Sequence, residues 1–181
     1  MRILRFVLAI EALCVALWVG GLLTLGAIVA PLVFGMVPAP TSADAMTAVF
    51  QRFDRVAMTA ATLALLCEVA GAKLRPRVER ADLLRAGLLV VMAGLVILQG
   101  AVFSPEIADL HRRGAVRGSG PLGQRLEVVH ARASASGKLQ FALGVAFFGL
   151  LVAPPPAGAG VGASTKREDE RESEGAPRPP T

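Results

Sequence analysis

Four long apolar stretches alternate with short polar connections along this chain. The first stretch runs from Phe6 to Phe34 and contains a single ionisable residue, Glu11. A helix crosses the hydrocarbon core of a bilayer with roughly 20 residues. Only helices and closed barrels satisfy their backbone groups in lipid, and the strand-like alternation of a barrel is absent from this sequence. The pattern therefore predicts an all-α protein, an integral membrane four-helix bundle with a disordered C-terminal tail.

Prolines and polar residues set the limits of the predicted helices. Spanning helices are expected at 5–33, 53–72, 83–103 and 131–153. Pro31 should kink or end the first helix, because proline lacks a backbone donor and clashes with the preceding turn. The Ser104-Pro105 step should close the third helix for the same reason.

The polar connections predict additional short helices. Pro40 is followed by a Thr-Ser-Ala-Asp run at 41–44, which indicates that a helix starts near residue 43 and continues to residue 52. We expect a short interfacial helix there, with Phe50 and Phe53 facing lipid. The Gly-Ser-Gly-Pro run at 118–121 should separate two further short helices before the fourth span.

The two ends of the chain differ in character. Arg2 and Arg5 followed by an apolar run would also suit a secretory signal peptide, but the apolar region of such a peptide is typically 7–15 residues long. Because this run continues to Phe34, we expect a retained membrane anchor. Residues 154–181 are rich in Pro and Gly and then carry mixed charge, which predicts disorder. The expected organisation is a four-span domain at 1–153 and a tail at 154–181.

Composition agrees with a membrane protein. Hydrophobic residues make up 54% of the chain, above the roughly 45–50% of soluble proteins. The net charge of +5 does not indicate nucleic-acid binding, because the Lys and Arg residues lie in the connections, where topology and anionic headgroups explain them. More of these residues flank the N-terminus, the second connection and the tail than flank the other two connections. This bias predicts an inner or plasma membrane location with both termini cytoplasmic.

Two acids inside the apolar helices form the principal candidate site. A charged residue at the centre of a membrane helix costs about 2.5–3.5 kcal/mol on insertion scales. Glu11 and Glu68 each lie about 8–9 Å below the same membrane surface, counted at 1.5 Å per residue. If the first two helices are antiparallel neighbours, the carboxyl groups can meet. They would then share a proton, or bind a cation or a basic partner such as Arg5 or Lys73. The alternative is that each acid reaches separately to an interfacial Arg or Lys.

The helix faces that carry these acids favour close packing. Glu11 shares its face with Cys14, Trp18 and Gly21, and we expect Trp18 to be a packing residue. Around Glu68 the second helix carries a stripe of small residues, which let membrane helices approach closely. This stripe comprises Ala60, Ala61, Ala64, Gly71 and Ala72.

A second polar layer is expected toward the opposite surface. Gln99 lies near the end of the third helix, and His130, Ser134 and Lys138 lie near the start of the fourth. A single His at a helix start is usually an interfacial hydrogen-bonding group rather than a metal ligand. No metal-binding spacing, phosphate-binding loop or hydrolase site occurs, so we expect no enzymatic activity and no cofactor. A soft metal ion stays open as a ligand, although the methionines do not cluster.

Several short motifs, in this order, carry a resemblance to a known family. They occupy 18–21 (Trp-Val-Gly-Gly), 30–34, 50–53, 104–107 and 130–134. With this set the chain resembles the transmembrane-protein-205-like domain, a four-span domain of unknown function. The Trp-Val-Gly-Gly step more distantly resembles the copper-resistance protein D family. The resemblance implies a membrane location and a helical bundle, and marks Trp18, Gly20, Gly21, Pro31 and Pro105 as structural motif residues.

Two classes of function follow from the sequence. The first is transport or binding of an ion or small ligand through the intramembrane acids, with Glu11, Glu68, Gln99 and His130 as candidate ligand-binding residues. The second is a structural or accessory role without chemistry, as a homo-oligomer or with a membrane partner.

Overall fold

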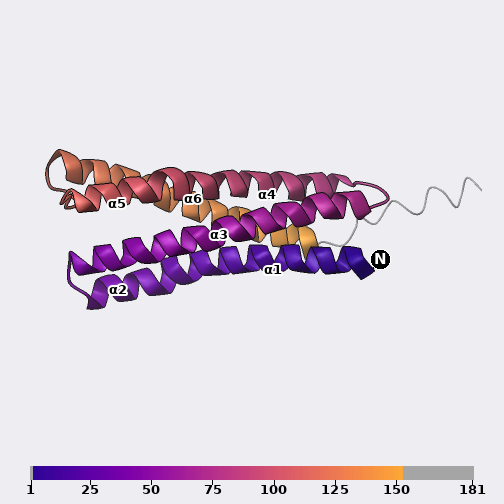
Figure 1. Ribbon diagram of the computed structural model, residues 1–181, viewed down its shortest axis with the longest axis horizontal. Helices are drawn as coiled ribbons and strands as arrows, with labels where there is room; N and C mark the ends of the chain where they lie inside the picture. The colour runs from indigo at the N-terminus through magenta and orange to yellow at the C-terminus, as the bar shows by residue number, and fades with distance from the viewer. Residues whose placement is uncertain (1, 153–181) are drawn as a thin grey trace, which may run out of the picture. The chain divides into compact units, whose positions relative to one another are not determined.

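The computed structural model describes residues 2–152, and all the regular structure in this part of the chain is helical (Figure 1). The predicted tail lies outside the described residues. The elements are α1 (Arg2–Thr24), the π-helix η1 (Leu25–Val29), α2 (Ala30–Met36), α3 (Thr41–Leu74), α4 (Arg80–Leu98), the π-helix η2 (Gln99–Phe103), α5 (Ser104–Arg112) and α6 (Gly120–Val152). The prediction of an all-α fold is confirmed.

These elements join into four uninterrupted helical rods, Arg2–Met36, Thr41–Leu74, Arg80–Arg112 and Gly120–Val152. Each rod is long and apolar enough to cross a membrane. A rod of this length measures about 50 Å, whereas the hydrocarbon core of a bilayer is about 30 Å thick. The chain is therefore a four-span membrane protein whose rods tilt or extend past the bilayer core.

Neither proline ends its helix, so the prediction that Ser104-Pro105 closes the third helix is wrong, and of the two outcomes expected at Pro31 the end of the helix is excluded. Helix continues past Pro31 to Met36 and past Pro105 to Arg112. Each proline follows a π-helical segment, in which the Ala30 N–H donates to the Leu25 carbonyl and the Ser104 N–H to the Gln99 carbonyl. The wider turn rearranges the carbonyls below the proline, so the ring is accommodated without breaking the helix.

The prediction of a separate interfacial helix at 43–52 is also wrong, because α3 runs unbroken from Thr41 to Leu74. Phe53, which was expected to face lipid, is half-buried. Its ring lies against Gly21, where an added Cβ would collide with it. The absence of a side chain at Gly21 thus lets α1 and α3 pack closely, while Gly20 lines a groove of about 520 Å³ beside it.

The fourth span begins earlier than residue 131. Helix α6 starts at Gly120, and α5 ends at Arg112, so the break covers 113–119 and not 118–121. Gly114, Gly118 and Gly120 have positive φ angles, which glycine adopts without steric cost. The expected short helices on either side of the break are the ends of the two long rods.

The bundle consists of two similar helical hairpins, here called the first hairpin (residues 2–74) and the second hairpin (residues 80–152). Each begins with a rod that contains a π-helix and ends with an unbroken rod. The π-helices also share sequence: Leu-Gly-Ala-Ile-Val-Ala-Pro ends at Pro31, and Gln-Gly-Ala-Val-Phe-Ser-Pro ends at Pro105. These features define an internal structural repeat.

The repeat extends to the buried faces of α1 and α4. The two π-helices start at Leu25 and Gln99. The same spacing in sequence separates the two members of each of four pairs of buried residues, one member on α1 and the other on α4. These pairs are Glu11 and Arg85, Val15 and Leu89, Trp18 and Met92, and Val19 and Ala93. In Figure 1, α3 lies between α1 and α4, and α6 crosses behind α3. Helices α1 and α4 thus present equivalent faces to one core, as in membrane proteins built from parallel repeats.

Candidate functional site

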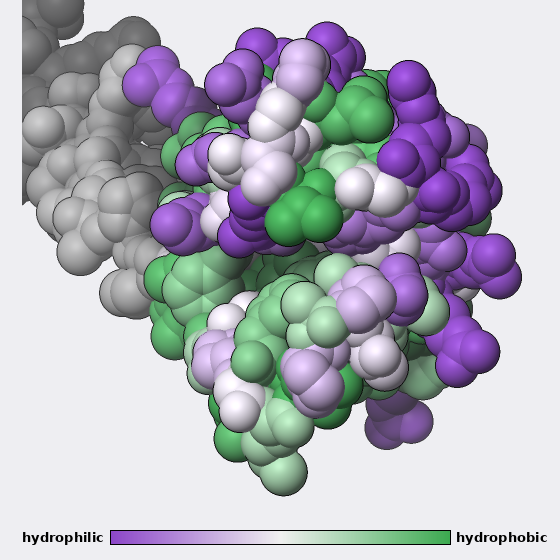
Figure 2. Space-filling model, turned by 90° about the vertical axis from the view of Figure 1, so that its left-hand side faces the viewer, coloured by the Kyte–Doolittle hydropathy of each residue, from purple (hydrophilic) through white to green (hydrophobic). Residues whose placement is uncertain are grey.

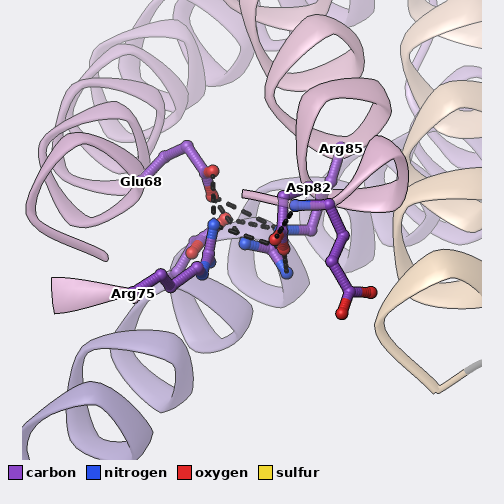
Figure 3. Close-up of polar contacts among 6 residues, drawn as sticks. Glu68, Arg75, Asp82 and Arg85 are labelled. Carbon is purple, nitrogen blue, oxygen red and sulfur yellow. Dashed lines mark hydrogen bonds and ion pairs between the residues drawn. The ribbon is translucent and has the colours of Figure 1, made fainter. Parts of the chain in front are cut away.

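A cluster of buried charged residues joins three helices at one end of the bundle (Figure 3). Glu11 comes from α1, Glu68 from the last two turns of α3, and Arg85 from the second turn of α4. Arg75 belongs to the connection between α3 and α4. Asp82 is held at the start of α4, where it accepts a hydrogen bond from the backbone N–H of the N-cap residue. These five residues, Glu11, Glu68, Arg75, Asp82 and Arg85, are called the charge cluster below.

Arg85 lies at the centre of the charge cluster. Its Nη2 donates to Glu68 Oε2 over 2.8 Å, and its Nε lies 3.5 Å from Glu11 Oε1. The guanidinium side chain is only 8% exposed. The two acids therefore meet on one basic group, as the sequence analysis allowed, but neither Arg5 nor Lys73 is that group. Arg85 was counted among the cations that flank the second connection, at the start of the span expected at 83–103, whereas α4 begins at Arg80 and turns Arg85 inward.

Arg75 adds a second bridge. Its Nη1 lies 3.2 Å from Glu68 Oε1 and 3.3 Å from Asp82 Oδ1. Glu68 is thus contacted by two guanidinium groups, one on each carboxylate oxygen. Such multiple charge-assisted contacts hold Glu68 in its ionised form.

Glu11 is in a different situation. It is 1% exposed, and neither of its carboxylate oxygens accepts a hydrogen bond within the described residues. If every group were ionised, the three carboxylates and two guanidinium groups of the charge cluster would leave one excess negative charge. A buried charge without full pairing is strongly unfavourable. Glu11 is therefore the member of the cluster that is suited to bind a cationic species.

Near the middle of the bundle, a buried hydrogen bond joins the two hairpins. The indole Nε1–H of Trp18 donates to Gln140 Oε1 over 3.1 Å, and the Gln140 amide donates to Ser136 Oγ over 3.3 Å. All three residues are buried. Trp18 is thus the packing residue that the sequence predicted, although its polar partner on α6 was not foreseen.

Two more polar contacts join the hairpins toward the opposite end. The Ser104 hydroxyl of α5 donates to the Asp54 carboxylate of α3, and both residues are buried. Thr47 Oγ1 and His111 Nδ1 are 3.1 Å apart. Asp54 was not among the predicted site residues, because it lies at the start of the span expected at 53–72. A signal was present, since Asp54 precedes Ala57, Ala61 and Glu68 at spacings that keep one helix face inward.

The predicted layer of Gln99 and His130 is not formed as one site. Gln99 lies in η2, where its Oε1 is enclosed and has no hydrogen-bond partner in the described part of the chain. His130 is half-buried on α6, where it lines a pocket of about 400 Å³ together with Ser134 and Lys138. Neither residue contacts the other within residues 2–152 by hydrogen bond or ion pair.

Among the described residues, no group of three His, Cys, Asp or Glu side chains is arranged to hold a metal ion. Cys14 and Cys67 are free thiols.

Most of the stripe of small residues on α3 is buried as predicted, and Ala72 alone among its members is exposed. The interior is thus built for close helix packing around a few polar contacts.

The family model for a domain of unknown function (DUF4149) matches residues 13–115, more than half of the chain. The chain therefore belongs to this family. No curated protein and no solved structure matches it. The matched region contains four members of the charge cluster and begins two residues after Glu11. The expected membrane domain of unknown function is thus supported, whereas the likeness to the transmembrane-protein-205-like and copper-resistance protein D families stays a prediction.

Proposed function

We propose that this member of the DUF4149 family is a transport protein, which carries a small cation across the membrane along the interface between its two hairpins. The observation that carries the proposal is Glu11, an acid with a 1% exposed side chain and no hydrogen bond, in a cluster with more acids than bases. Ionisable groups that face the interior of a membrane bundle mark ion pathways in many transporters.

Polar contacts between the hairpins support this route. They occur at four successive levels along the bundle and are here called the polar seam. The seam consists of Glu11, Glu68 and Arg85, then Trp18, Gln140 and Ser136, then Asp54 and Ser104, and finally Thr47 and His111. In transporters built from repeats, ion sites commonly lie at the interface between the repeated units.

The seam is not an open pore. Apolar side chains of the core, among them Val15, Leu89 and Phe147, are fully buried between the polar levels. An ion that binds at the charge cluster therefore passes further only when the hairpins move or water enters. The arrangement suits a carrier better than a channel.

Flux through liposomes tests the proposal. The full chain is reconstituted, and proton, sodium and potassium fluxes are followed with ion-sensitive dyes under an imposed gradient. The wild-type chain should carry one of these ions above the level of protein-free vesicles, and Glu11→Gln should lose that activity. Glu127→Gln is the matched control, because Glu127 is an exposed glutamate on α6. Absence of flux for all three ions in the wild-type chain would overturn the proposal.

A structural or accessory role is the second candidate, and the position of Arg85 favours it. This one side chain contacts acids from α1, α3 and the first turn of α4, so it holds three helices together. In that case the wild-type chain carries no ion, and substitutions in the charge cluster change only stability or the assembly with a partner.

We further propose an inner or plasma membrane location, with the α3–α4 connection and the N-terminus on the cytoplasmic side, and no enzymatic activity. Single cysteines at Val78 and at Ser119, in a chain without Cys14 and Cys67, test the orientation. An impermeant thiol reagent added to intact cells should label the second position only. Labelling of the first position alone would reverse the orientation.

A further inference from the structure

We propose that the cation bound by Glu11 is a proton, which Glu11 shares with Glu68 beside the Arg85 guanidinium. This inference rests on the proposed function and names its substrate, and it can be tested without any transport measurement.

The charge balance requires one additional positive charge. Glu11, Glu68 and Asp82 face Arg75 and Arg85, so one carboxylate is left without a compensating cation. Asp82 keeps partial access to water, since its side chain is 19% exposed. Glu11 is 1% exposed, so the uncompensated charge would be most unfavourable there.

A metal ion does not fit this position. The Arg85 Nε lies 3.5 Å from Glu11 Oε1 and would repel a second fixed cation beside the same oxygen. Hard cations such as Ca²⁺ and Mg²⁺ also require about six or more oxygen ligands. No such group of side chains is present within residues 2–152. A proton requires only one lone pair, so it satisfies the charge without displacing Arg85.

The geometry selects Glu11 as the group that takes the proton. Arg85 Nη2 lies 2.8 Å from Glu68 Oε2, and Arg75 Nη1 contacts the other Glu68 oxygen over 3.2 Å. Glu68 is therefore held ionised. Glu11 has only the longer contact to Arg85 and no hydrogen bond.

The same geometry provides an acceptor for the proton. Arg85 Nε lies 3.3 Å from Glu68 Oε2 and 3.5 Å from Glu11 Oε1, so both carboxylates lie against one nitrogen. Protonation converts Glu11 into a hydrogen-bond donor, which then has the ionised Glu68 as a neighbour. The step forms one O–H bond on Glu11 and breaks one O–H bond of a hydronium ion at the near membrane surface, which becomes water.

Infrared difference spectroscopy tests the assignment. The full chain in lipid is titrated from acidic to alkaline pH in a potassium buffer, and the carbonyl stretch of protonated carboxylic acid is recorded. The wild-type chain should show such a band at neutral pH. The band should lose the intensity due to Glu11 in Glu11→Gln and stay unchanged in the exposed control Glu127→Gln. Glu11→Asp keeps a carboxyl group and should retain a band at a changed frequency, which separates loss of the acid from loss of the fold.

Two results would overturn the inference. One is the absence of a protonated carboxyl band in the wild-type chain, and the other is a band whose intensity at neutral pH is the same in Glu11→Gln as in the wild type. Neither result depends on transport. A sodium flux without a Glu11 band would leave the proposed function standing and remove the proton, whereas a Glu11 band without any flux would keep the proton site and remove the transport function.

Discussion

The two hairpins share a backbone plan but differ in charge. At equivalent positions, α1 carries Glu11 where α4 carries Arg85, and these two residues contact each other. The first hairpin contributes the buried acids Glu11, Asp54 and Glu68, whereas the second contributes the donors Arg85 and Ser104. The repeated backbone therefore determines where the two hairpins contact each other. The side chains make the two contacting surfaces complementary in charge.

The hairpins also differ at the end of the bundle shown in Figure 2. Hydrophilic residues cover much of the end formed by α5 and α6, and the end formed by α2 and α3 is more apolar. Ile28, Leu32, Phe34 and Met36, from the end of the first rod, all expose more than half of their side chains. Exposed apolar residues of a membrane protein face lipid, so we infer that α2 stays in the bilayer while α5 reaches the interface.

Removing the central cation should have the largest effect on this complementarity. Arg85→Met leaves Glu11 and Glu68 buried without their shared partner, which should cost about 3–5 kcal/mol of stability. Thermal unfolding in detergent measures the loss. Arg125→Met is the control, because its ion pair with Glu106 is largely exposed and should contribute at most about 1 kcal/mol. Equal losses for both variants would show that Arg85 has no special role.

Close packing between the hairpins gives the next largest effect. An added Cβ at Gly144 would collide with Val19 of the first hairpin, whereas Gly149 on the same helix has open space. Gly144→Ala should therefore destabilise the chain by about 1–3 kcal/mol. Gly149→Ala should be neutral or slightly stabilising, since alanine favours helix over glycine. A stable Gly144→Ala variant would contradict the contact between α1 and α6.

The smallest expected effect concerns the neutral level of the polar seam. Trp18→Phe removes the donor to Gln140 and leaves a buried amide oxygen without a partner, which should cost about 1 kcal/mol. Gln140→Leu in the same chain should recover part of that loss, because the buried amide oxygen that Trp18→Phe leaves unpaired is then absent. A double-mutant cycle from thermal unfolding measures the coupling, and additive losses would exclude the hydrogen bond.

The sequence was sufficient to predict the four spans and the common depth of Glu11 and Glu68. The apolar stretches and the rise of a helix determine both. It was not sufficient to place the helix ends, because α3 and α6 continue as polar helices where hydropathy carries no signal. For the same reason Arg85 and Asp54 fell at the starts of the expected spans 83–103 and 53–72, and neither was predicted as a buried polar residue. The partner of an intramembrane acid depends on which helices are diagonal neighbours, and a single sequence does not contain that information.

The central claim is that Glu11 is present for ion transfer and not for stability. Proton uptake into liposomes and thermal unfolding, measured on the same preparations of wild type and Glu11→Gln, test it most directly. We expect Glu11→Gln to abolish uptake while its unfolding temperature stays close to that of the wild type, because glutamine is neutral and of the same size as the protonated Glu11. A variant that unfolds earlier and carries protons as the wild type does would contradict the account.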